Sequence, residues 1–226
     1  MNAKTPMKLS NSTTNILKNF STINQSILIK EGNKLKTISV MKNILAEAEI
    51  EEEFEREFAI YDLNQFLSGL SLYNAPDLDF GESYLTIRDG SRRAKYFFAD
   101  PNVIVSPPDK EISLPSRDVC FTVATQQLDA LLKAAAIYQV SDLSAVGRNG
   151  KVELVVHDKK NDTSHDFVEE VGVTDDEFCF NFKVENIKII PGSYDVVISS
   201  KLLAEFTNKN VNLKYYIALE PDSTYV

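Results

Sequence analysis

Hydrophobic and polar residues alternate with a period of two along most of the chain and shift to helical spacing in only a few segments. Apolar residues three or four positions apart predict helices, which we expect at residues 10–21, 63–73, 125–139 and 185–190. Period-two alternation bounded by turn residues predicts strands, which we expect at 26–30, 35–40, 45–50, 54–61, 84–88, 94–99, 119–123, 143–147, 152–157, 167–171, 178–182, 194–199, 203–207 and 213–219. The pattern therefore predicts a strand-rich chain with a few helices.

The order of these elements repeats in the two halves of the chain. Each half reads as a strand, a helix, several strands, a second helix and more strands. Between the halves, residues 100–117 hold four of the eight prolines, a composition that favours an extended, helix-free connection. We therefore predict an internal duplication, with two similar domains joined by a linker at 100–117.

Composition and charge narrow the classes of function. Hydrophobic residues make up 43% and charged residues 25% of the 226 residues, which is typical of a globular chain able to form a core. The 24 basic and 33 acidic residues give a net charge of −9. That charge argues against a protein that coats nucleic acid through its overall charge, although a local basic surface is compatible with it. No apolar run approaches the roughly 20 residues of a membrane-spanning helix, and the first ten residues have no apolar signal core.

The charges are distributed unevenly between helices and strands. The four predicted helices together hold two acidic residues, whereas an even spread would place about six there. Their three basic residues are Lys18, Lys133 and Lys188. A surface with a few lysines among neutral polar groups is typical of a protein that contacts phosphates without reading base sequence. The alternative is a set of amphipathic helices that simply carry few charges.

Two other functional classes have to be weighed. Seven glutamates within residues 47–57 could serve acid–base catalysis, but a continuous acidic run on a strand is more typical of a solvated face. His157 and His165, with Asp166, match no common metal-ligand spacing. We therefore predict no catalytic residue, no metal site and no cofactor, and we expect Cys120 and Cys179 to be buried free thiols. A non-catalytic β-rich structural or scaffold protein is the alternative function.

Short stretches spread over residues 7–226 match one known family in order and spacing. They are Met7-Lys8-Leu9-Ser10, Thr13-Thr14, Leu17-Lys18-Asn19-Phe20, Ala59-Ile60-Tyr61-Asp62-Leu63-Asn64, Ala99-Asp100-Pro101, Leu131-Leu132, Phe180-Asn181-Phe182, Pro191-Gly192 and Asp222-Ser223-Thr224. With them the chain resembles the ring-shaped DNA polymerase sliding clamps of T-even-type bacteriophages. The resemblance implies the α+β DNA clamp fold, with helices lining a central hole and antiparallel sheets outside. It also implies a first domain at 7–110, a second at 118–226 and an N-terminal extension at 1–6.

The resemblance implies a function without catalytic activity. The chain would be a DNA polymerase processivity factor, a head-to-tail homotrimer that encircles duplex DNA and tethers the phage replicative polymerase. The implied partners are duplex DNA, the C-terminal peptide of the DNA polymerase, an ATP-dependent clamp loader, further copies of this chain and late transcription factors, with no membrane partner. The implied location is the cytoplasm of the infected bacterial host.

The resemblance also implies three functional surfaces. The DNA-facing residues would be Lys18, Lys133 and Lys188, with Lys8 and Lys183 as further candidates, because Ala134, Ala135 and Ala136 stand where the family has additional bases. A partner-peptide pocket beside the linker would be formed by Val103, Ile104, Val105 and Pro107, with Leu70, Tyr73, Pro221 and Tyr225. Subunits would meet at edge strands 93–99 and 166–172 through Tyr96, Phe98, Val168 and Val171. Packing within their own domain is the alternative role for the pocket and interface residues.

Overall fold

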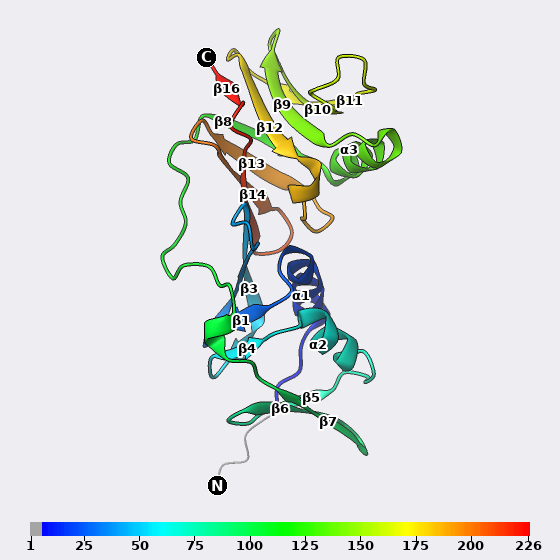
Figure 1. Ribbon diagram of the computed structural model, residues 1–226, viewed down its shortest axis with the longest axis vertical. Coiled ribbons are helices and arrows are strands. Elements are labelled where there is room, and N and C mark those ends of the chain that lie inside the picture. The colour runs from blue at the N-terminus through cyan, green and yellow to red at the C-terminus, as the bar shows by residue number, and fades with distance from the viewer. Residues whose placement is uncertain (1–5) are drawn as a thin grey trace. The chain divides into compact units, whose positions relative to one another are not determined.

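A computed structural model describes residues 6–226, which fall into two compact units that adjoin in sequence at Pro108 and Asp109 (Figure 1). The N-terminal extension predicted at 1–6 lies, apart from Pro6, outside the described residues. Each unit combines helical segments with antiparallel strands and buries its own apolar core. The predicted α+β class is confirmed.

The described part of unit 1 places two α-helices against small antiparallel sheets. The pairings are β1 with β4, β2 with β3, and β6 between β5 and β7. In chain order the elements are α1 (Asn11–Ile23), β1 (Ile27–Ile29), β2 (Gly32–Ile38), β3 (Ile44–Phe54), β4 (Phe58–Ile60), α2 (Leu63–Leu70), β5 (Asp77–Phe80), β6 (Tyr84–Asp89), β7 (Arg92–Phe97) and the 3₁₀ turn η1 (Pro101–Val103).

Helix α1 shows how the sequence forms these elements. The Ser10 hydroxyl accepts a hydrogen bond from the Thr13 backbone N–H and so caps the helix. Leu17 and Phe20 recur at helical spacing and are fully buried, so one face of α1 packs into the unit. The opposite face is left for solvent or a ligand.

Unit 2 contains one α-helix and two antiparallel sheets. One sheet has the order β11-β10-β9-β12-β16, and the other contains the run β8-β13-β14-β15. In chain order the elements are β8 (Val119–Val123), α3 (Thr125–Tyr138), β9 (Asp142–Arg148), β10 (Lys151–His157), β11 (Phe167–Val173), β12 (Phe178–Lys183), the 3₁₀ turn η2 (Val184–Asn186), β13 (Tyr194–Ser199), β14 (Leu203–Asn208), β15 (Leu213–Ala218) and β16 (Thr224–Tyr225).

The two units share one topology. Helices α1 and α3 are each followed by four strands, one helical segment and three further strands, and unit 2 then adds the short strand β16. The first and fourth of those strands pair in both units, as β1 with β4 and β9 with β12. Met7 bridges Leu78 of β5, just as β8 pairs with β13. The repeated pairing agrees with an internal duplication.

The short helical turn predicted at 185–190 is only partly correct. The structure has the 3₁₀ turn η2 at its start, and Lys188 lies in the irregular segment that follows. Ile187, Ile189 and Ile190 are β-branched residues with low helix propensity, and Pro191 follows directly. A four-residue apolar spacing was therefore too short a signal to define a helix.

Three other expectations also need correction. The strands predicted at 45–50 and 54–61 are instead one long strand, β3, followed by the short β4, and the linker contains the turn η1. Cys120 is exposed and Cys179 is half-buried, so neither thiol is fully buried, although both are free. Cys120 alternates with Val119 and Phe121 along β8, which turns its side chain to the outer face.

Candidate functional site

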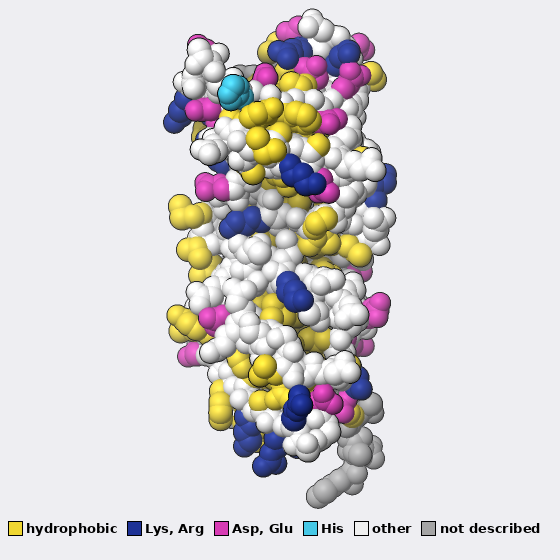
Figure 2. Space-filling model, turned by 90° about the vertical axis from the view of Figure 1, so that its right-hand side faces the viewer, with side chains coloured by type: hydrophobic (Ala, Val, Ile, Leu, Met, Phe, Trp, Pro, Cys, Tyr) yellow, Lys and Arg dark blue, Asp and Glu magenta, His cyan; other side chains and the backbone are white. Residues whose placement is uncertain are grey.

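Two of the predicted DNA-facing lysines stand on helix faces directed away from the cores. Lys18 is exposed on α1, and Lys133 is exposed on α3, where the buried positions are Leu128, Leu131 and two alanines. Neither ammonium has a carboxylate partner within residues 6–226. The face in Figure 2 shows basic side chains that are mostly set apart from one another on uncharged and apolar surface, some of them beside acidic side chains. These two charges are therefore available to a polyanion.

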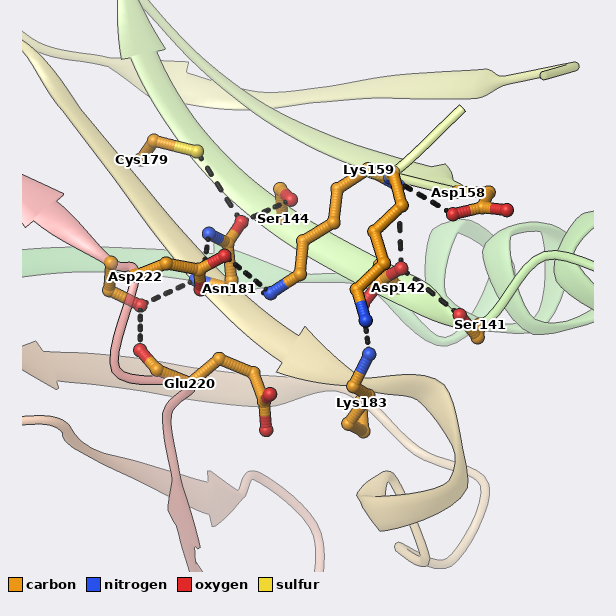
Figure 3. Close-up of polar contacts among 12 residues, drawn as sticks. Ser141, Asp142, Ser144, Asp158, Lys159, Cys179, Asn181, Lys183, Glu220 and Asp222 are labelled. Carbon is orange, nitrogen blue, oxygen red and sulfur yellow. Dashed lines mark hydrogen bonds and ion pairs between the residues drawn. The ribbon is translucent and has the colours of Figure 1, made fainter. Parts of the chain in front are cut away.

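Lys183 is engaged within its own unit. Its Nζ lies 2.6 Å from Oδ1 of Asp142, a carboxylate that is 1% exposed (Figure 3). Burial, the largest influence, raises the pKa of Asp142, but hydrogen bonds from Lys183, Ser141 and the Lys159 backbone together lower it below its ordinary value. The same hydrogen bond raises the pKa of Lys183. Its charge therefore neutralises a buried acid, and Lys183 is a poor candidate for DNA contact.

The other predicted bases are placed differently. Lys8 lies 3.5 Å from Asp77, with both side chains exposed, a geometry that leaves its charge only weakly compensated. Ala134 and Ala135 are buried on α3, and Ala136 is exposed. Two of these three alanines therefore face the core, so at those positions a base would displace apolar packing rather than add surface charge.

The linker residues of the predicted pocket do not share one environment. Val103 and Val105 are exposed, Pro107 is half-buried and Ile104 is buried. The Asn24 Nδ2 donates to the carbonyl oxygens of Val105, at 3.1 Å, and Ile38, at 2.8 Å. This amide holds the linker beside the base of the turn between β2 and β3.

That turn carries two apolar residues that the sequence reasoning missed. Met41 is 81% exposed and Val40 is 68% exposed, in a turn where Lys42 adopts φ 58°. An exposed apolar pair at a hairpin turn, where polar residues are usual, was the signal available in the sequence. We define the linker patch as Val40, Met41, Val103 and Val105, exposed apolar residues on two segments that Asn24 joins.

The remaining predicted pocket residues lie apart from the linker patch or are held within unit 2. Leu70 ends α2, and Tyr73 lines a separate groove that no residue of the linker patch lines. The Tyr225 ring stacks on Phe180, with centroids 6.0 Å apart, and so fixes β16 onto its sheet. Pro221 is exposed, and next to it Asp222 accepts hydrogen bonds from Lys159 and Asn181 (Figure 3).

The two predicted interface segments are both edge strands. Strand β7 ends the sheet β5-β6-β7, and β11 ends the sheet that begins β11-β10. An unpaired strand edge presents free backbone donors and acceptors to another chain. Beside β7, a groove of about 600 Å³ is lined by residues of α2, of β7 and of the segments next to α2, including Tyr61, Leu72 and Phe97.

The apolar residues of these edges divide between the core and the surface. Tyr96 packs on Phe66 and its hydroxyl donates to the Asp62 carbonyl, while Phe98 packs on Phe58. The outward aromatic residue of β7 is Phe97, which is 66% exposed. On β11, Val168 is 41% exposed and Val171 is half-buried. The sequence reasoning identified the strand but placed two inward residues at its surface and missed Phe97.

The acidic run forms one face of β3 rather than a catalytic cluster. Its glutamates alternate with buried apolar residues, except that Glu52 occupies an inward position. Glu52 accepts hydrogen bonds from the Ser10 backbone N–H and the Thr13 hydroxyl, at the N-terminus of α1. Burial, the largest influence, raises the pKa of Glu52, but these hydrogen bonds together lower it below its ordinary value. Glu52 therefore anchors the helix that carries Lys18.

Glu52→Gln is expected to destabilise unit 1 by about 1.5–3 kcal/mol at neutral pH, because hydrogen bonds to a charged acceptor are lost. The pKa of Glu52 is lower in the folded state, so its contribution is present above the ordinary value of 4.5 and is lost as the pH falls through the folded-state value. Denaturant unfolding of both proteins at several pH values measures this. Glu51→Gln, on the exposed face, is the control, and a Glu52→Gln deficit that persists in acid would contradict the assignment.

The two histidines do not converge on a site. The His157 ring forms a 2.8 Å hydrogen bond with the Ser144 hydroxyl, and the His165 ring packs against Tyr138. Within residues 6–226 no group of three or more His, Cys, Asp or Glu side chains is placed to hold a metal ion. No helix in that part of the chain is long and apolar enough to cross a membrane.

Comparison with known proteins identifies a family. A family model described as DNA polymerase processivity factor matches residues 8–106. The sliding clamp of Vibrio phage KVP40 is 32% identical over 222 residues, which cover 95% of this chain and 99% of that protein. The sliding clamp of Enterobacteria phage T4 is 34% identical over 230 residues, which cover 97% of this chain and 99% of that protein.

Solved structures show the same fold at lower sequence identity. The PCNA of A. fulgidus, solved with the C-terminal region of FEN-1 bound, superposes with a TM-score of 0.69 at 13% identity, covering 93% of this chain and 96% of that one. The DNA polymerase III subunit beta sliding clamp of Bartonella birtlesii gives 0.71 at 15% identity, covering 97% of this chain and 66% of that one. The relatives extend over nearly the full chain and the structures share its DNA clamp fold. The chain therefore belongs to the sliding clamps, the family of DNA polymerase processivity factors.

Proposed function

We propose that this sliding clamp acts as a closed, head-to-tail homotrimer around duplex DNA, with clamp domains at 7–110 and 118–226. The observation that carries the proposal is that β7 and β11 each end a sheet among residues 6–226, with one strand edge unpaired there and an exposed apolar residue on the strand. Pairing each β7 with β11 of the next copy would satisfy both edges, and a head-to-tail contact closes into a ring when the rotation permits.

Solution mass tests the trimer. Three chains of 25.4 kDa give about 76 kDa, and light scattering over a range of concentrations should show that mass, falling only on dilution. A species that stays at about 25 or 51 kDa at high concentration would contradict the trimer.

The DNA-facing surface in this proposal is formed by α1 and α3, through Lys18 and Lys133. Their exposure and lack of a carboxylate partner within residues 6–226 support the assignment. Lys8, which is paired with Asp77, would contribute less to DNA contact. Lys188 would contribute from the irregular segment after η2 rather than from a helix. A few phosphate contacts suffice, because a closed ring cannot leave DNA sideways and weak contacts allow it to slide.

Lys18→Ala combined with Lys133→Ala should shorten processive synthesis several-fold at about 150 mM salt and reduce the salt dependence of DNA retention, because each lysine releases about one counterion. The trimer mass should not change. Primer-extension length and light scattering measure the two effects. Lys110→Ala with Lys160→Ala removes equal charge from exposed positions off the helices and is the control. Unchanged processivity in the helix variant would contradict the DNA-facing assignment.

The proposed docking site for the polymerase C-terminal peptide is the linker patch. Its exposed valines and Met41 offer apolar contact area, and methionine side chains adapt to varied partners. The A. fulgidus structure, with a C-terminal region of FEN-1 bound to its PCNA, supports a peptide-docking role in this fold. Tethering raises the effective concentration of the polymerase at the primer end without new contacts to DNA.

The remaining parts of the proposal concern proteins outside this chain. A separate clamp loader would open the ring with ATP, and late transcription factors would use the DNA-bound ring in the cytoplasm of the infected bacterial host. The chain itself would supply no catalytic group.

A further inference from the structure

The two edge strands carry opposite charge. Residues 92–99, which include β7, hold three basic residues and no acidic one, and residues 166–173, which include β11, hold three acidic residues and no basic one. The charged residues are Arg92, Arg93 and Lys95 on the first segment and Asp166, Glu169 and Glu170 on the second. The chain as a whole has a net charge of −9, so the basic segment 92–99 differs in sign from the protein around it.

Two basic residues of β7, Arg93 and Lys95, lie at positions whose backbone groups face its unpaired edge. The Phe98 backbone N–H donates to the Ser83 carbonyl at 3.0 Å, on the side of β6. Inward and outward backbone groups alternate along an antiparallel strand, so those of Arg93, Lys95 and Phe97 point away from β6. The same three side chains are exposed. A strand docking here would meet two positive charges beside one aromatic ring.

Unit 1 does not neutralise this edge. Arg93 faces another base, Arg88, in the β6–β7 register, and has no carboxylate partner within residues 6–226. Asp89 is engaged by the Asn74 backbone N–H at 2.9 Å. The Lys95 ammonium lies 4.4 Å from the centroid of the Tyr84 ring, a contact that leaves its charge uncompensated. The edge therefore keeps its positive charge.

The acidic edge is only partly neutralised. Lys151 pairs with Glu170 at 2.6 Å, with both side chains about half exposed, so the pair is weak. Asp166 and Glu169 have no basic partner within residues 6–226. Val168 adds an exposed apolar residue between these acids. The β11 edge thus offers negative charge that is opposite to that of β7, together with an exposed apolar residue that can contact Phe97.

We propose that charge directs ring closure in this clamp: the basic edge β7 of one copy docks against the acidic edge β11 of a second copy, beside Phe97 and its groove. The inference rests on the proposed homotrimer. Like-charged contacts of β7 with β7, or of β11 with β11, are repelled, so the charges select head-to-tail assembly. Salt screens these contacts. In about 1 M salt, where the Debye length is about 3 Å, the ring should therefore dissociate at a higher protein concentration than in low salt.

Charge reversal tests the proposal. Arg93→Glu/Lys95→Glu makes both edges acidic, and Glu169→Lys/Glu170→Lys makes both edges basic. Each should raise the concentration needed for half-assembly at least about 100-fold by light scattering, since like charges across an interface cost several kcal/mol. All four substitutions in one chain restore opposite edges and should restore the mass of about 76 kDa. The control Lys42→Glu/Lys110→Glu makes the same change of charge as Arg93→Glu/Lys95→Glu at positions away from both edges. It should leave the trimer mass unchanged.

Mixing the two reversed variants adds a geometric control. An all-acidic chain and an all-basic chain attract each other at both edges. A ring of three cannot alternate two kinds of chain, so at least one of its contacts joins two chains of the same kind, which repel. The mixture should therefore form even-numbered or open assemblies and should not recover the closed trimer. Circular dichroism checks that every variant is folded.

The outcomes separate the inference from the proposed function. If the wild-type chain is not a trimer, the ring and the inference fall together. If the wild type is a trimer and both folded two-residue variants keep its mass, the ring stands and the charge proposal is overturned. A folded four-substitution chain that stays monomeric, while the two-residue variants also fail to assemble, would likewise overturn it.

Discussion

Phe97→Asp is expected to abolish the trimer and leave the subunit folded. Phe97 is 66% exposed on the edge strand β7, and the ring it contacts within unit 1 is that of Tyr84, with centroids 5.6 Å apart. Unit 1 therefore loses little packing when this ring is removed. In the proposed ring the next subunit would cover it, and an unpaired carboxylate at that place costs several kcal/mol at every interface.

Light scattering measures the first effect, as a fall from about 76 to about 25 kDa at micromolar concentration. Denaturant unfolding should change by less than about 1 kcal/mol, as for most surface substitutions. Processive synthesis should fall to the level of the polymerase alone, because a monomer does not encircle DNA and therefore dissociates from it. A folded variant that retains the trimer mass would show that β7 does not form the interface.

Met41→Asp combined with Val105→Asp should keep the trimer but lose tethering of the polymerase. Both side chains belong to the linker patch and are exposed, so the subunit and the ring should be retained. A docked apolar peptide would meet two charges, and loss of such central contacts costs about 2 kcal/mol or more each, or about 30-fold in affinity. Polymerase tethering should therefore be lost while the ring still loads onto DNA.

Processive primer extension and retention of the ring on a nicked circle separate these effects. The linker-patch variant should fail the first and pass the second, whereas Phe97→Asp should fail both. Each variant is thus the matched control for the other, since both introduce a carboxylate at an exposed apolar site. Full processivity in the linker-patch variant would show that the polymerase docks elsewhere.

Long periodic segments were the part of this fold that the sequence could predict. Helix α1 combines a side-chain cap with apolar spacing, and α3 is rich in Leu and Ala, which favour helix. Their exposed lysines follow from the helical periodicity. The segment 185–190 was predicted only in part because it is short and β-branched, and its expected helix is the turn η2. Strand β3 was divided in the prediction because Glu52 interrupts the alternation, although its carboxylate is buried to cap α1.

The sequence predicted the exposure of a site residue correctly where it depends on one helix or strand alone. It failed where the exposure depends on packing between two elements. Lys18 faces outward because Leu17 and Phe20 are buried on the same helix. Phe97 and Tyr96 are neighbours on β7, and which of them is exposed depends on Phe66 of α2. The linker patch depends on Asn24, which joins a turn to a linker more than 60 residues later in the sequence. Such tertiary contacts leave no periodic signal.

The most direct test of a topologically held clamp is its retention on DNA of different topology. The ring is loaded with its clamp loader and ATP onto a nicked circular duplex and separated from free protein by gel filtration. The DNA is then cut once. A sliding clamp should stay with the circle and leave the linear product through its ends within the time of the column. Equal retention on circular and linear DNA, by a protein shown to be loaded, would contradict encirclement and indicate ordinary surface binding.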